Sequence, residues 1–286
     1  MSADQTVQLP VIGLGAAARG SRGRRLYWAV SDGWTIACRD FGHLRRSPSQ
    51  FVVALIIPAT MVVLFGYVFG SAIVVPGGGN YREYLMPGLY GMTTVTGVMG
   101  TALTAASDSA RGVMDRFRSM PMARSAVPFG RTIADLCTGI MGMVIMAGCG
   151  LAVGWRFHHG WLSALGAFTL LVLLRYAVSW VGMYLGLAVR NEETAYQVVP
   201  LIFPLTMISN TFVPTESMPT WLRVVADWNP VSAVVAACRE LFGNPGLPYG
   251  EVALPLRHPV VTTLCWTIGL LAVFGPQAVR LYRAGR

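Results

Sequence analysis

Residues 51–75 form a run of 25 consecutive positions without a charged side chain. A transmembrane helix needs about 20 apolar residues to cross roughly 30 Å of hydrocarbon, so this run is long enough to span a bilayer. Five further apolar runs of similar length follow it, over residues 85–106, 133–154, 161–189, 195–213 and 259–279. Lipid offers no hydrogen-bond partner to an open sheet edge, which favours helices. We therefore predict an all-α polytopic membrane protein with six transmembrane helices.

The charge content supports lipid as the main solvent. Only 12% of the residues are charged, against about 25% in a typical soluble domain. The net charge is +9, and every one of the 22 basic residues is Arg. A basic chain can bind nucleic acid or an anionic membrane face, but here the Arg residues cluster beside the apolar runs, which favours the membrane and no nucleic acid.

The distribution of Arg predicts the orientation. Seven Arg precede the first run and five more lie between the second and third runs. Short cytoplasmic segments carry the excess of basic residues, so both termini are expected to be cytoplasmic. Residues 1–25 are rich in Gly, Ala and Arg with little to bury, and we expect a disordered tail. The five Cys are scattered, and His158 and His159 have no further ligands nearby, so we predict no disulfide framework and no metal site.

Two segments outside the runs have helical patterns. Residues 26–48 place apolar side chains at steps of three and four with Arg off the stripe, which predicts a helix lying on the cytoplasmic leaflet. An ordinary helix packed on a soluble partner remains the alternative. Residues 214–258 contain six Pro and no uninterrupted apolar run long enough to span, which predicts short external helices of the re-entrant or interfacial kind.

The loop over residues 107–131 is the strongest candidate for a functional contact. Asp108 with Arg111, and Asp115 with Arg118, are opposite charges three residues apart and would support a short helix. Such an amphipathic helix could dock in a partner's groove, but composition alone favours a solvated basic loop equally. The chain has no Lys and so cannot hold a phosphate-binding P-loop, which means that an ATPase driving it would be another polypeptide.

Three stretches resemble one family. They are GVMDRFRSMPMARS over residues 112–125, RNEETA over 190–195, and SNTFVPTESMPTWLRVVADWNPVSAVVAACREL over 209–241. They are similar to type-two ABC transporter permeases, specifically the DrrB-like branch of drug and lipid exporters. The similarity runs from about residue 46 to the C-terminus, and its motifs occur in the family's order.

This resemblance implies a permease of the bacterial inner membrane that exports an amphipathic drug-like molecule or a lipid. It implies two copies of a cytoplasmic ABC ATPase, a second permease copy and surrounding lipid as partners. ATP and Mg²⁺ would be bound by the ATPase, with no cofactor in this chain. The residues implied to couple the permease to the ATPase are Gly112, Val113, Asp115, Arg116, Phe117, Arg118 and Pro121. Those implied in a connecting helix are Trp34, Arg39, Phe41, Arg45 and Arg46. Those implied in an external gate are Phe212, Pro214, Pro219, Trp221, Pro230 and Arg239.

Arg175 interrupts the fourth run near its middle. Such an Arg costs at least about 2.5–3.5 kcal/mol on insertion scales and so usually faces a cavity or a partner. It is expected to line the substrate path or dimer interface with Ser179 as a weak partner, or else to donate to backbone carbonyls of a neighbouring helix. Asp135, at the entry of the third run, is expected to pair with Arg131 or to face the coupling loop.

Two other classes compete with the exporter. An ATP-independent secondary transporter would need ionisable groups deep in the membrane, and the sequence offers only Arg175 there. A membrane-embedded lipid enzyme would need a nucleophile with a base, or a metal cluster, and the sequence offers neither. The transported molecule, and the choice between a homodimer and a heterodimer, stay open.

Overall fold

The computed structural model describes residues 56, 60–64, 80–112, 114, 126–189, 191–213, 215, 218–246 and 253–284. The secondary structure of these residues is helical. Its elements are α3 (Tyr81–Ala110), α5 (Ala126–Val153), α6 (Gly160–Val189), α7 (Glu192–Val198), η3 (Val199–Leu201), α8 (Ile202–Met207), α9 (Thr220–Asp227), α10 (Pro230–Phe242), α11 (Leu254–Arg257) and α12 (Pro259–Ala284). The predicted helix over 26–48 and most of the first predicted span lie outside the described residues.

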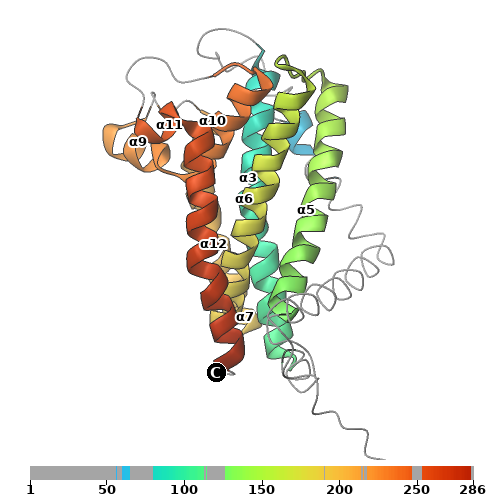
Figure 1. Ribbon diagram of the computed structural model, residues 1–286, viewed down its shortest axis with the longest axis vertical. Helices are drawn as coiled ribbons and strands as arrows, with labels where there is room; N and C mark the ends of the chain where they lie inside the picture. Colours follow the sequence, from blue (N-terminus) through green and yellow to red (C-terminus); the bar gives the residue numbers. More distant parts are fainter. Residues whose placement is uncertain are drawn as a thin grey trace, which may run out of the picture.

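Four long helices run side by side through the molecule (Figure 1). Three of them, α5 from Val127, α6 and α12, are long and apolar enough to cross a membrane. They correspond to the predicted runs over 133–154, 161–189 and 259–279. The all-helical membrane fold is therefore confirmed for the described residues, while the total of six spans stays a prediction.

Helix α3 is largely buried inside the bundle. It has 30 residues, and its buried positions include Thr94 and Thr101. Gly182 and Gly186 of α6 face it so closely that an added Cβ at Gly182 would lie 2.6 Å from the Val98 carbonyl oxygen, and one at Gly186 would collide with the Ala102 carbonyl. This G-x-x-x-G pair thus packs α6 against α3 within one chain.

The fifth predicted span is an interrupted helix. Asn191 caps α7 by accepting a hydrogen bond from the Glu193 backbone N–H. Helix η3 contains Pro200, and α8 then ends at Met207. Pro200 lies within this short 3₁₀ segment, and a Pro inside a helix removes one backbone hydrogen bond, which accounts for the interruption.

The bundle has two distinct ends (Figure 1). Helices α9 and α11 lie at one, which we call the α9 end, with α10 running beside the long helices there. The other, the α7 end, holds α7 and the C-terminus of α12. Helix α10 begins at Pro230, is capped by the Asn229 side chain and ends at Gly243, whose φ of 70° suits glycine.

An aromatic cluster fixes α10 to the bundle. Trp155, Phe242, Tyr90 and Phe168 pack with ring centroids 5.1–5.7 Å apart in edge contacts. The Trp155 indole Nε1 also donates to Asn244 Oδ1 at 2.9 Å, so the polar edge of this ring is satisfied.

Candidate functional site

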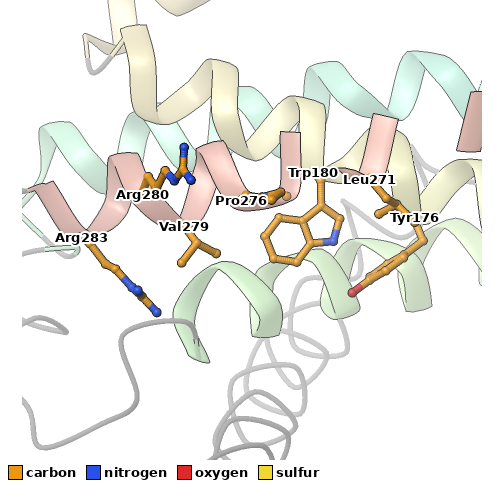
Figure 2. Close-up of a pocket in the computed structure, with 8 residues that line it drawn as sticks. Tyr176, Trp180, Leu271, Pro276, Val279, Arg280 and Arg283 are labelled. Carbon is orange, nitrogen blue, oxygen red and sulfur yellow. The ribbon is translucent and has the colours of Figure 1, made fainter. Parts of the chain in front are cut away.

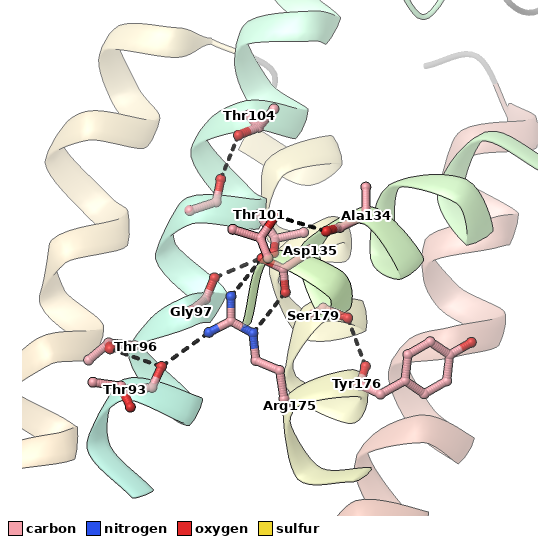
Figure 3. Close-up of polar contacts among 12 residues, drawn as sticks. Thr93, Thr96, Gly97, Thr101, Thr104, Ala134, Asp135, Arg175, Tyr176 and Ser179 are labelled. Atoms are coloured by element: carbon pink, nitrogen blue, oxygen red, sulfur yellow. Dashed lines mark hydrogen bonds and ion pairs between the residues drawn. The ribbon is translucent and has the colours of Figure 1, made fainter. Parts of the chain in front are cut away.

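A buried ion pair joins α5 and α6 inside the bundle (Figure 3). Arg175 donates through Nε to Asp135 Oδ2 at 2.9 Å and through Nη2 to Asp135 Oδ1 at 2.8 Å. The two side chains are only 11% and 15% exposed. A bidentate arrangement of this kind is the strongest geometry available to a guanidinium and a carboxylate. It compensates the charge that Arg175 would otherwise bring into an apolar helix.

The third nitrogen of the guanidinium reaches a third helix. Arg175 Nη1 donates to the Thr93 carbonyl oxygen of α3 at 3.1 Å. Gly97 of α3 and Gly139 of α5 leave the room for the group, since an added Cβ at Gly139 would lie 2.9 Å from Nε and one at Gly97 would collide with Nη1. One side chain thereby binds α3, α5 and α6 together.

This geometry corrects two of our expectations. Asp135 pairs with Arg175, not with Arg131 or the coupling loop, because α5 begins at Ala126 and carries Asp135 well inside the helix. The prediction that no acid lies deep in a span was therefore wrong. Ser179 is not the partner of Arg175 either, because its hydroxyl donates to the Tyr176 carbonyl at 2.8 Å.

The close approach at Gly97 gives a direct test. We expect Gly97→Ala to destabilise the protein by about 1–3 kcal/mol, since the new methyl group pushes the guanidinium away from Asp135. Gly100→Ala, on the same helix, adds a Cβ with nothing within 4 Å and should leave stability unchanged or raise it by up to about 1 kcal/mol. Denaturant unfolding in mixed micelles measures both, and equal effects would contradict the assigned packing.

Two ion pairs lie at the α7 end, where the predicted coupling loop leaves α3 and enters α5. Asp108 of α3 pairs with Arg131 of α5, so the two ends of the loop are tied together. Arg111, at the end of α3, lies 3.5 Å from Glu192 of α7 in a more exposed pair. The intrahelical pairing of Asp108 with Arg111 predicted from their spacing was wrong, because both side chains have acidic or basic partners on other helices.

Of the predicted coupling residues, the structure describes Gly112, whose φ of 67° turns the chain away from α3. Val113, Asp115, Arg116, Phe117, Arg118 and Pro121 lie outside the described residues, as do Trp34, Arg39, Phe41, Arg45 and Arg46 of the predicted connecting helix. Met114 is buried in a cluster with Val127 and Tyr282, so the loop packs on the bundle at this residue.

At the α9 end, Arg239 of α10 is only 1% exposed. Its Nη2 donates to the carbonyls of Asn210 at 2.9 Å and Tyr84 at 3.2 Å. A weaker contact reaches the Thr211 carbonyl at 3.4 Å. The guanidinium carbon lies 3.8 Å from the centroid of the Tyr84 ring, in a cation–π contact. Arg239 thereby joins α10, α3 and the turn after α8.

The other predicted gate residues are spread over this end. Phe212 lies in the turn beside Arg239's acceptors and is half-buried, and Pro230 is the first residue of α10. Pro219 caps α9, on which Trp221 is 70% exposed, so these two residues are not gathered with Arg239. Pro214 lies outside the described residues.

Sequence reasoning missed the Arg175–Asp135, Asp108–Arg131 and Arg239–Tyr84 contacts. The first had a usable signal: Asp135 lies 18 residues before the end of α5, and Arg175 lies 15 residues after the start of α6. In an antiparallel hairpin, these offsets differ by only about 5 Å of helix rise. Among the residues that the structure describes, no group of three His, Cys, Asp or Glu could hold a metal ion.

Residues 32–242 match the model of a family described as ABC-2 type transporter. The chain belongs to this family. It is 33% identical over 260 residues to the daunorubicin resistance ABC transporter permease protein DrrB1 of Streptomyces coeruleorubidus, covering 89% of this chain and 87% of that protein.

Two relatives from Mycobacterium tuberculosis agree with this assignment. The doxorubicin resistance ABC transporter permease protein DrrB is 28% identical over 68% of each chain. The probable doxorubicin resistance ABC transporter permease protein DrrC is 25% identical over 81% of each chain. The chain is accordingly the membrane permease subunit of an ABC exporter, a transport subunit and not an enzyme.

Proposed function

We propose that this permease exports an amphipathic drug-like molecule from the cytoplasm or inner leaflet of a bacterial cell. The observation that carries the proposal is the match over 89% of the chain to a permease named for daunorubicin resistance. The DrrB and DrrC relatives are named for resistance to doxorubicin. Efflux from the inner membrane, and hence antibiotic resistance, is the cellular function that follows.

Energy would come from two copies of a separate ABC ATPase that bind ATP and Mg²⁺. In this proposal the ATPase docks on residues 112–121, where Asp115, Arg116, Phe117 and Arg118 transmit its movement. The Asp108–Arg131 pair supports the idea, because it joins the two ends of the loop. A displacement of the middle of the loop would then be transmitted to both α3 and α5. The helix over 26–48 would form a second contact with the ATPase.

A second permease copy would complete the transport path. The relatives named DrrB and DrrC come from one organism, which is compatible with a heterodimer as well as a homodimer. Both termini and the α7 end would face the cytoplasm, since the Arg residues gather there. The α9 end would then be external, with α9 and α10 as the gate.

Two single substitutions in the loop test the coupling. In cells that co-express the permease and its ATPase, we expect Asp115→Arg or Phe117→Ala to lower drug export and permease-stimulated ATP hydrolysis by about tenfold, which corresponds to about 1.4 kcal/mol. The physical reason is loss of a charge contact or an apolar anchor at a docked helix. Drug accumulation and phosphate release measure the two effects.

Arg257 is an exposed charge beside α12 at the α9 end. Arg257→Gln is therefore the matched control and should leave drug export and ATP hydrolysis unchanged. A Cys introduced at Ser119 in a Cys-free background should react only with reagents added from the cytoplasmic side. Labelling from outside, or recovery of the tagged permease without any ATPase, would overturn the proposed coupling.

A further inference from the structure

An open groove lies between α6 and α12 in the half of the bundle nearest the C-terminus of α12 (Figure 2). Its volume is about 440 Å³. Helix α6 contributes Tyr176 and Trp180 to the lining. The residues that line it from α12 are Leu271, Gly275, Pro276, Val279, Arg280 and Arg283.

The groove has an apolar body and a cationic end. Arg280 and Arg283 are exposed and come from the last turns of α12, and the lining contains no acidic residue. Neither Arg has an acidic partner among the residues that the structure describes. These two guanidinium groups offer a pair of cations to an anionic ligand, and they would repel a cationic amphiphile.

The position of the groove limits what can fill it. Within the membrane-crossing window of α12, only 17% of the residues are buried by the protein, so most of this helix is open to contact with lipid. From Leu271 to Arg283 the helix rises about 18 Å, which reaches from the interface into the hydrocarbon core. An occupant must then be apolar along this length and anionic at the end that meets water.

We propose that the groove binds one anionic phospholipid from the leaflet at the α7 end. Its acyl chain lies along Leu271, Gly275 and Trp180, and its phosphate accepts hydrogen bonds from Arg280 and Arg283. Basic residues at a membrane surface attract anionic lipids at roughly 1 kcal/mol each, and two residues one helical turn apart can share one phosphate. An apolar protein partner would leave both cations uncompensated.

Gly275 and Gly269 supply a matched pair of variants. A Cβ at either position would meet nothing within 4 Å, so a larger side chain fits both without a clash. Gly275 lines the groove and Gly269 does not. We expect Gly275→Leu to fill the groove and weaken lipid binding about tenfold, while Gly269→Leu leaves it unchanged. The double change Arg280→Gln with Arg283→Gln should weaken it at least tenfold, and Arg257→Gln should not.

The measurement uses purified, delipidated full-length permease in detergent, titrated with phosphatidylglycerol or phosphatidylcholine and followed by native mass spectrometry. Brominated phosphatidylglycerol should also quench a fluorescence component that Trp180→Phe removes. The proposal predicts phosphatidylglycerol preferred by tenfold or more. Equal affinity for the two lipids, or full affinity in Gly275→Leu, would overturn it, as would groove variants that change only the oligomeric state. The assay involves no ATPase and no export, so its failure would leave the proposed transport function untouched.

Discussion

Arg175→Met is expected to lower the free energy of unfolding by about 3–5 kcal/mol, because it leaves the Asp135 carboxylate buried without its partner. Asp135→Leu should cost a similar amount by leaving the Arg175 guanidinium uncompensated between three helices. The double variant should recover most of the loss, since replacing both members of a buried ion pair with apolar groups is often close to neutral. Denaturant unfolding of the four proteins in mixed micelles completes this cycle.

The cycle also separates the two roles left open for Arg175. A coupling energy near zero between Arg175 and Asp135 would contradict the bidentate ion pair that the structure shows for them. If the double variant regains both stability and export, Arg175 acts by holding α5 and α6 in position. If it regains stability but not export, a charge of the pair is needed for transport itself. Arg257→Gln, which removes an exposed charge outside the bundle core, should leave stability within about 0.5 kcal/mol of the parent.

Much of the bundle could be predicted because a helix that faces lipid needs a continuous run of apolar residues, and such runs are visible in the sequence. The runs over 133–154, 161–189 and 259–279 correspond to α5, α6 and α12, two of which are mostly unburied by protein. Helix α3 is less apolar, since protein surrounds it and permits buried Thr side chains. The prediction still placed a span there because its charges lie at its ends.

The ion pairs were harder to predict. Spacing rules find partners three or four residues apart, so they offered Arg131, besides the coupling loop, for Asp135, and Arg111 for Asp108. Each of these charges instead pairs across helices, as with Asp135 and Arg175, 40 residues apart. Only the register of the α5–α6 hairpin brings those two to one depth. Backbone acceptors such as the Tyr84 carbonyl are still less visible, because every residue has one.

Arg239 is the second residue whose loss should be costly. We expect Arg239→Met to destabilise the protein by about 3 kcal/mol, since it removes charge-assisted hydrogen bonds to the carbonyls of Tyr84 and Asn210 and leaves both buried. Arg239→Lys should fail to restore this stability, because an ammonium cannot reproduce the forked geometry of the guanidinium or its stacking on the Tyr84 ring. Thermal unfolding in detergent measures both variants.

The loss of stability in Arg239→Met should be concentrated in the segments that Arg239 joins. This distinguishes a specific contact between segments from a general contribution to packing. Arg239 joins α10 to α3 and to the turn at Asn210, so hydrogen exchange in Arg239→Met should rise first at these three segments and not in α5. Arg257→Gln on α11 is the matched control, because this side chain is exposed and should contribute less than about 0.5 kcal/mol. Uniform exchange across all helices would show that Arg239 does not act as the tie between α10 and the bundle.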